Sequence, residues 1–404
     1  MEQNESVVIQ PKTVTSRITS IDVARGLVMV IMALDHVRDL LHTAALTQNP
    51  ADLATTTPAI FMTRWITHLC APTFVFLSGM SAYLSLQKQR ASGPPSWSAR
   101  SFLLKRGLVL ILLELTIINF AFWFDLQFRT IMLQVIYAIG GGFVLLAFLS
   151  RWPARWLGIL GLVIIFGHDL LLLVPPFDDQ TARFIWSLFF RTDLFNFSPQ
   201  FVVLVGYPLI PWLGIMLAGY GCGQLMERPA GRRQQVLLRI GLGAVALFVV
   251  LRLLNVYGDV APWSAQKDGL FTLLSFINVS KYPPSLQYTL LLVGLGLLVM
   301  ALAEGADNAM TRVLTVYGKV PMFYYILHWY LVHLSMIAMS LFQGYSLADI
   351  PAGPLNFGRP DGAGVSLPVV YLVWITLVAA LYPLCRWYGR YKAAHPEKVL
   401  LRYI

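Results

Sequence analysis

The feature that most constrains this chain is an apolar segment of membrane-spanning length, residues 17–42, with charged groups at both ends. Asp22 and Arg25 lie near its start, and His36 and Asp39 lie near its end. At 100° per residue, the eleven-residue separation puts Arg25 and His36 on one helix face, three turns apart. Ionisable groups at membrane depth usually face a protein interior or a water-filled cavity. We therefore expect the chemistry of this chain along that face.

The composition extends this interpretation to the whole chain. Of its 404 residues, 57% are hydrophobic and 12% are charged, whereas a soluble domain carries about 25% charged residues. Apolar runs of spanning length recur along the sequence. The sequence therefore predicts an all-α polytopic membrane bundle of about ten transmembrane helices. We expect these helices at residues 20–42, 61–86, 102–122, 130–149, 155–174, 202–224, 236–256, 286–303, 320–342 and 367–388.

The formal net charge of +10 raises the question of a nucleic-acid partner. The basic residues form no single patch but fall into short loops between apolar segments, as is typical of cytoplasmic loops. We therefore expect a lipid bilayer and no nucleic acid as partner, with both termini in the cytoplasm. The predicted organisation is a cytoplasmic tail at residues 1–17, a transmembrane domain at 18–390 and a second cytoplasmic tail at 391–404.

The longer connections fall on the opposite side of the predicted membrane, at residues 43–60, 175–201, 257–285 and 344–366. Long loops in a compact protein are often functional. Within the second connection, residues 181–197 have helical periodicity and many aromatic residues. This pattern predicts an interfacial helix on the outer surface.

Cysteine and histidine usage argues against a metal or haem protein. The three cysteines, Cys70, Cys222 and Cys385, are isolated, which supports neither a disulfide framework nor a metal site. A b-type haem requires histidine pairs at matched depth on facing helices, and the sequence offers no second matched pair. We therefore predict no metal.

His36 is the leading catalytic candidate, because the unperturbed pKa of histidine suits proton transfer near neutral pH. Asp39, one turn later, is expected to hold the imidazole in one tautomer, while Asp35 and Arg38 are spaced to pair with each other. The alternative is a polar cap at headgroup level. The Asp22 and Arg25 groups on the same face favour the functional interpretation.

Five further residues stand out along the chain. His68 precedes Pro72 near the outer start of a helix, Trp212 lies at a proline kink, and His328 lies near mid-membrane among aromatic residues. Lys281 and Tyr282 precede two prolines that fix a turn, so Lys281 either holds an anionic group of a substrate or snorkels to lipid headgroups. The candidate substrate-binding residues are Asp22, Arg25, Arg38, His68, Trp212, Lys281, Tyr282 and His328.

Six short motifs, taken in order, resemble the bacterial relatives of heparan-α-glucosaminide N-acetyltransferase. They are Ser20 to Gly26, Asp35 to Asp39, Ala71 to Gly79, Pro211 to Gly214, Lys281 to Ser285 and Pro321 to His328. The separation of Arg25 from His36 is also similar to the arginine–ten residues–histidine pattern of the membrane acyltransferase-3 enzymes.

The resemblance implies an enzyme that moves an acyl group, usually acetyl, from cytoplasmic acyl-CoA to a sugar-like hydroxyl or amine on the far side. His36 matches the essential histidine of the family, as general base or transient acyl carrier, and Arg25 matches the arginine of the acyltransferase-3 pattern. The acceptor is expected to be a small molecule or a glycan, and the location the bacterial inner membrane. The CoA phosphates would favour the basic inner mouth, where the candidates are Arg25, Lys105, Arg106 and Arg239.

Two questions stay open at this point. A transporter or flippase could use the same polar face without covalent chemistry, and consumption of acetyl-CoA would distinguish the two. The sequence also leaves open whether the chain forms a homodimer.

Overall fold

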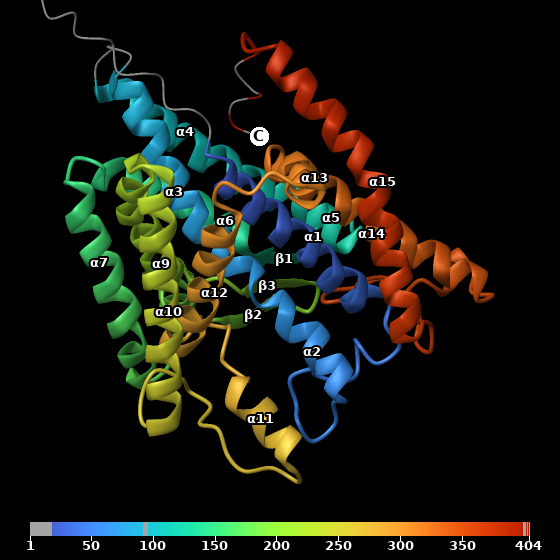
Figure 1. Ribbon diagram of the computed structural model, residues 1–404. Coiled ribbons are helices and arrows are strands. Elements are labelled where there is room, and N and C mark those ends of the chain that lie inside the picture. The colour runs from blue at the N-terminus through green and yellow to red at the C-terminus, as the bar shows by residue number, and fades with distance from the viewer. Residues whose placement is uncertain (1–17, 92–95, 399–400, 402, 404) are drawn as a thin grey trace, which may run out of the picture.

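The computed structural model describes residues 18–91, 96–398, 401 and 403, which form a mainly helical bundle (Figure 1). Its α-helices are α1 (Thr19–Leu41), α2 (Pro58–Thr67), α3 (Cys70–Ala91), α4 (Ser96–Leu113), α5 (Asn119–Trp123), α6 (Val135–Leu149), α7 (Ala154–Gly167), α8 (Gln180–Phe189), α9 (Leu209–Cys222), α10 (Ala230–Leu254), α11 (Gly269–Ile277), α12 (Leu286–Ala303), α13 (Ala309–Gly318), α14 (Pro321–Phe342) and α15 (Leu367–Ala394).

Seven helical segments in the described part of the chain are long and apolar enough to cross a membrane. They are Pro58–Arg90, Ala154–Leu173, Leu209–Glu227, Ala230–Leu254, Leu286–Ala303, Pro321–Phe342 and Leu367–Ala394. This confirms the prediction of a polytopic helical membrane protein.

The other three predicted spans coincide with helices that differ from a simple apolar span. α1 is long enough, since 23 residues extend about 34 Å, but charged residues interrupt its apolar surface. The helix α4 passes through a π-helix, Glu114–Ile118, into the short α5. The span expected at residues 130–149 begins as a strand, so its helix α6 has only 15 residues.

The helices divide into a periphery and a centre. Only 22%, 22% and 17% of the residues in the apolar stretches of α7, α10 and α15 are buried within the protein, against 67% for both α9 and α12. α7 and α10 form one flank of the molecule and α15 the opposite flank (Figure 1). The exposed apolar faces of these flanking helices suit contact with lipid chains.

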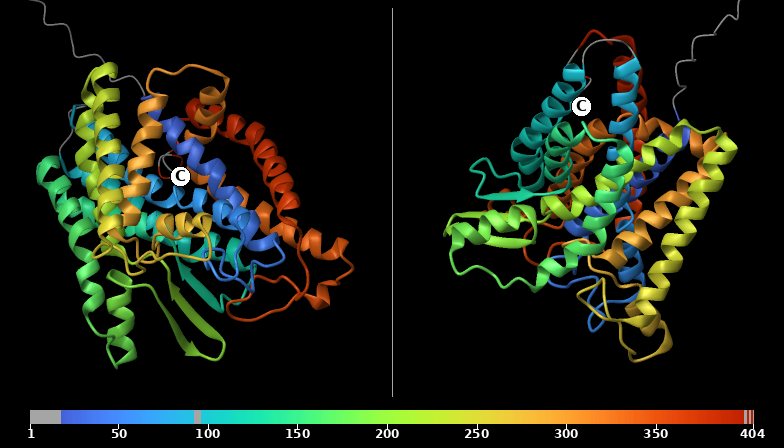
Figure 2. Two further views of the ribbon diagram at one scale, coloured as in Figure 1. Left: turned by 60° about the horizontal axis from the view of Figure 1, so that its bottom comes forward. Right: turned by 90° about the vertical axis from the view of Figure 1, so that its left-hand side faces the viewer.

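α1 runs through the centre, where it packs against α3, α12, α13, α14 and α15 (Figure 2). Its contact with α13 is a backbone-to-backbone contact, because a Cβ atom on Gly26 would collide with the carbonyl group of Leu314. In the same way, a Cβ atom on Gly318 would collide with the carbonyl group of Asp22. Two glycines on facing helices therefore fix α1 and α13 to each other at close range.

A small sheet departs from the all-α prediction. Its strands are β1 (Thr130–Leu133), β2 (Asp193–Ser198) and β3 (Phe201–Val205), in the order β1–β3–β2. β1 pairs with β3 in parallel, with Thr130 opposite Val202, and β2 pairs with β3 in antiparallel. The interfacial helix predicted at 181–197 is therefore wrong in its second half, since α8 ends at Phe189. The reason is that Asp193 to Asn196 pair with Val205 to Val202 of β3, a contact with another segment that helical periodicity in the sequence does not reveal.

The two ends of the described chain lie on the same side of the bundle, because Ile18, Lys392 and Tyr403 line one cavity. The predicted C-terminal tail is partly helical, since α15 continues past residue 390 to Ala394. The predicted N-terminal tail, residues 1–17, lies outside the described residues.

Candidate active site

A break between α2 and α3 opens the protein beside α1. Pro72 lies in the first turn of α3, where it has no backbone N–H to donate to the carbonyl oxygen of His68. The hydroxyl group of Tyr288 donates to that oxygen instead, at 3.0 Å. The regular helix is therefore interrupted at His68 and Leu69 with the His68 carbonyl group satisfied, and Thr67 and Cys70 on either side of the interruption line a cavity.

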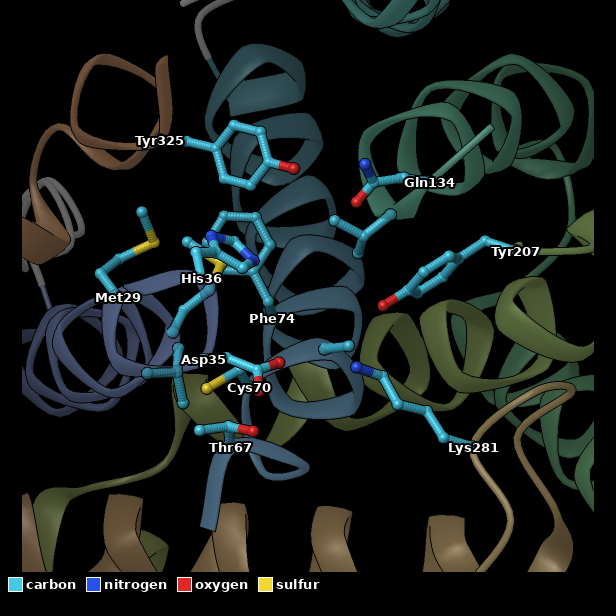
Figure 3. A pocket seen from close by; sticks show the side chains of 14 residues that line it. Met29, Asp35, His36, Thr67, Cys70, Phe74, Gln134, Tyr207, Lys281 and Tyr325 are labelled. Carbon is cyan, nitrogen blue, oxygen red and sulfur yellow. The ribbon is translucent and has the colours of Figure 1, made fainter. Parts of the chain in front are cut away.

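This outer cavity has a volume of about 40 Å³ and contains the leading catalytic candidate, His36 (Figure 3). The polar ends of Tyr207 and Lys281 point into it from the side opposite Asp35 and His36. Its lining residues are Val28, Met29, Met32, Asp35, His36, Thr67, Cys70, Ala71, Phe74, Gln134, Val135, Tyr207, Lys281 and Tyr325.

A chain of hydrogen bonds fixes the tautomer of His36. The Nδ1 atom of His328 lies 3.0 Å from the carbonyl oxygen of Tyr324, which can only accept, so this nitrogen carries a proton. His328 is fully buried and has no carboxylate partner in the described structure, which favours its neutral form. Its Nε2 atom is then an acceptor, 2.7 Å from Nδ1 of His36. His36 therefore donates through Nδ1 and keeps a lone pair on Nε2.

The second nitrogen of His36 is free to react. Nε2 has no hydrogen-bond partner among the described residues, and the ring lines the outer cavity. The indole of Trp329 stacks on the imidazole, with ring centroids 3.8 Å apart. The ring is therefore held on one edge by His328 and on one face by Trp329, an arrangement suited to a general base or a nucleophile.

The predicted contact between Asp39 and His36 is wrong. The Asp39 carboxylate pairs with Arg38, its neighbour in sequence. The predicted pair of Asp35 and Arg38 is present at 2.9 Å, and Arg64 from α2 also binds Asp35, at 2.5 Å. Two arginines thus compete for these carboxylates more strongly than a neutral imidazole does, and the orienting role passes to His328.

Lys281 reaches the cavity from a loop that is anchored on both sides. The Asp259 carboxylate accepts hydrogen bonds from the backbone N–H and the hydroxyl group of Ser280, at 2.9 and 2.7 Å. On the other side, Nε2 of His168 lies 2.7 Å from the carbonyl oxygen of Pro284. None of the ion pairs formed by the described residues involves Lys281. Its ammonium group is therefore available to an anionic group in the cavity.

Three predicted substrate-binding residues lie behind the cavity wall. His68 and Trp212 are buried and are absent from the described lining residues. Trp212 stacks on Tyr207, with ring centroids 4.6 Å apart, so it supports a residue that does line the cavity. Tyr282 is 44% exposed and packs its edge against the same tyrosine ring.

The two remaining candidates, Asp22 and Arg25, lie at the other end of α1. The guanidinium group of Arg25 donates to Asp22 at 3.2 Å, to the carbonyl oxygen of Gly318 at 3.1 Å and to the hydroxyl group of Ser81 at 2.7 Å. Arg25 lines a second, much larger cavity of about 1620 Å³, here called the vestibule. The predicted face of α1 therefore connects two separate cavities.

The vestibule is rich in basic residues. Its lining includes Arg25, Lys88, Arg106, Arg228, Arg233, Arg312, Lys319 and Lys392. The Nε atom of Arg106 is buried there without a hydrogen-bond partner. Lys105 and Arg239, which were predicted alongside Arg25 and Arg106, are absent from the described lining. Most of these cations lie on helices, among them Arg25 on α1 and Arg106 on α4, so several helices contribute charge to one opening.

Sequence reasoning missed several residues of the outer cavity. Tyr207 and Gln134 carry no motif signal of their own, and Tyr325 lies within the Pro321 to His328 motif but was not singled out as a site residue. Cys70 was assigned only by exclusion, as a cysteine outside any metal site. Arg64 had a usable signal, because it is a cation one turn before the helix break at His68.

Comparison with known proteins agrees with this geometry. The sequence model of the heparan-alpha-glucosaminide N-acetyltransferase catalytic domain matches residues 17–254, more than half of the chain. The chain belongs to this family. The match includes Arg25 and His36 and ends before Lys281 and His328. No curated protein matches the chain. The protein is therefore a member of a membrane acetyltransferase family.

Proposed function

We propose that this protein transfers an acyl group, usually acetyl, from cytoplasmic acyl-CoA to a hydroxyl or amine of a small molecule or glycan on the extracytoplasmic side. The observation that carries the proposal is the arrangement along α1. Arg25 lines a wide basic vestibule and His36 lines a small separate cavity with its Nε2 atom free. The proposed setting is the inner membrane of a bacterium.

The vestibule suits the large anionic part of the donor. Its volume of about 1620 Å³ exceeds that of a typical small-molecule pocket, about 300–1,000 Å³. The phosphates of CoA would bind Arg25 and Arg106, because a guanidinium group matches phosphate geometry. The thin pantetheine arm would then follow α1 toward His36, about 16 Å away along the helix.

His36 acts as the general base in the proposed reaction. Its Nε2 atom takes the proton from the acceptor hydroxyl or amine while the acceptor oxygen or nitrogen attacks the thioester carbonyl carbon. The carbon–sulfur bond breaks, and the proton passes from His36 to the CoA thiolate. In the alternative course, Nε2 attacks the thioester carbonyl carbon and the carbon–sulfur bond breaks to release the CoA thiolate. The acceptor then attacks the acyl carbon, the bond to Nε2 breaks, and the acceptor proton passes to the thiolate. The hydrogen bond from Nδ1 to His328 supports both courses, because it directs the lone pair into the cavity.

Lys281 is the proposed contact for the acceptor. It shares the outer cavity with His36 and has no carboxylate partner among the described residues. Its loop is anchored through Asp259, and its ammonium group points into the cavity from the side opposite His36.

Release of free thiol from acetyl-CoA by the detergent-purified protein tests the proposal. We expect slow release without an acceptor, loss of release in His36→Gln, and unchanged CoA binding in that variant. Acid quenching followed by intact-mass measurement would detect an acylated protein and so distinguish the two courses. A wild-type protein that neither binds CoA nor releases thiol would contradict the proposal and favour a transporter.

A further inference from the structure

One aromatic residue lies on the boundary between the vestibule and the outer cavity. Of the described residues, Phe74 on α3 is the one that lines both spaces. Its side chain is one of those drawn around the outer cavity that contains His36 (Figure 3). Phe74 is therefore the side chain at which the two spaces come nearest to sharing a wall.

The space beyond Phe74 is small. At about 40 Å³ the outer cavity holds roughly three water molecules, at about 10–15 Å³ for each. An acetyl group has three non-hydrogen atoms, two carbons and one oxygen. Each further methylene of a longer acyl chain would need space that the present walls occupy.

Part of the wall of the outer cavity, formed by α1 and Phe74, is apolar. Val28, Met29 and Met32 from α1 line the same cavity as Phe74, and a longer acyl chain would have to displace them or the ring. Methionine side chains adapt to their surroundings because they are unbranched, whereas a phenyl ring is rigid. The ring is therefore the stricter limit on the length of the acyl group.

We propose that Phe74 is the residue that restricts this protein to short acyl groups, by closing the donor side of the His36 cavity. This inference rests on the proposed function, since it assumes an acyl-CoA donor in the vestibule. Replacing the ring by a methyl group would join the two spaces and give a longer acyl chain an apolar surface to cover.

The test is binding of an acyl-CoA series to the full-length protein in detergent. Displacement of radiolabelled acetyl-CoA by acetyl-, butyryl- and hexanoyl-CoA gives relative affinities. In the wild type we expect the longer chains to bind more weakly than acetyl-CoA. In Phe74→Ala we expect the order to reverse, with a gain of about fourfold for each added methylene that becomes buried. Phe74→Leu should lie between the two.

Phe102→Ala is the matched control, because Phe102 lines the vestibule but not the outer cavity. It should leave the chain-length order unchanged. Equal binding of all three donors by the wild type would overturn the inference, as would an unchanged order in both Phe74 variants. Absence of any acetyl-CoA binding by the wild type would instead contradict the proposed function.

Discussion

The two cavities along α1 differ in size and in what lines them. The vestibule measures about 1620 Å³ and gathers cations from many loops. The outer cavity measures about 40 Å³ and contains one imidazole, one carboxylate and one ammonium group. A large basic space suits recognition of a polyanion, whereas a small enclosed space suits chemistry away from bulk water. Under the proposed function, the donor is recognised in the vestibule and the acyl group reacts in the outer cavity. Mutations in the two cavities should therefore have separable effects on binding and on rate.

The largest effect is expected from His36→Gln, which removes the base from the outer cavity. Glutamine keeps a similar size but cannot accept a proton at neutral pH, so thiol release from acetyl-CoA should fall by about 10²–10⁴-fold. The affinity for CoA should stay within about twofold, because His36 lies outside the vestibule. Isothermal titration with CoA and a thiol-reactive dye measure the two quantities. Near wild-type release would show that His36 is not the base.

The next largest effect is expected from the histidine that positions His36. In His328→Leu the imidazole loses its acceptor at Nδ1, and misorientation of a base costs about 10²-fold in rate. In His328→Gln the side-chain oxygen can accept the same hydrogen bond, so part of the activity should return. The measurement is kcat together with its pH profile.

A purely structural role for His328 gives a different result. In that case both variants would lose thermal stability, and the glutamine variant would restore no rate. Equal rates in the leucine and glutamine variants would therefore contradict the positioning role.

A smaller effect, confined to binding, is expected from Arg106→Gln in the vestibule. Its Nε atom is buried without a partner, and one charge-assisted hydrogen bond to a phosphate contributes about 10-fold or more in affinity. The dissociation constant for CoA should rise by about that factor while kcat at saturation changes little. Arg155→Gln is the control, because Arg155 contacts Trp156 and lies outside the described vestibule lining. An equal loss of CoA affinity in both variants would mean that CoA binding depends only on the overall charge of the protein.

The smallest effect is expected from Asp125→Asn, which touches neither cavity. Hydrogen bonds from the Arg129 guanidinium group, at 2.9 and 3.0 Å, hold the pKa of Asp125 below its usual value. This stabilisation is present above the ordinary carboxyl pKa of about 3.9 and is lost as the pH falls through the lower folded value. Thermal unfolding should therefore begin about 1–2 °C lower in the variant at pH 7, with a smaller difference near pH 3. A difference that grew on acidification would contradict this assignment.

Much of the helical fold was predictable because membrane spans are long and apolar. The shared face of Arg25 and His36 followed from helix geometry alone, and the structure puts the two residues in the two cavities. The pair of Asp35 and Arg38 was also predictable, since it is local. Both features depend only on the spacing of residues within one helix, and that spacing can be read from the sequence.

The rest of the site depends on contacts between distant segments. His36 and His328 are 292 positions apart, and Arg64 reaches Asp35 from another helix. The prediction for Asp39 failed because helix spacing alone does not determine whether its carboxylate binds His36 or Arg38. The strand at residues 193–198 was missed because it forms by pairing with β3, which is a contact between segments and not a local pattern.

The close contact between α1 and α13 limits how α1 can move when a donor molecule binds along it. Gly26 and Gly318 let the two backbones touch, so α1 has little freedom to slide or rotate. Arg25 and His36 both belong to this tightly packed helix. The distance between their backbones therefore stays the same whichever molecule binds along α1. Under the proposed function, a thioester whose arm is shorter than this separation would not reach the imidazole while its phosphates remained bound near Arg25.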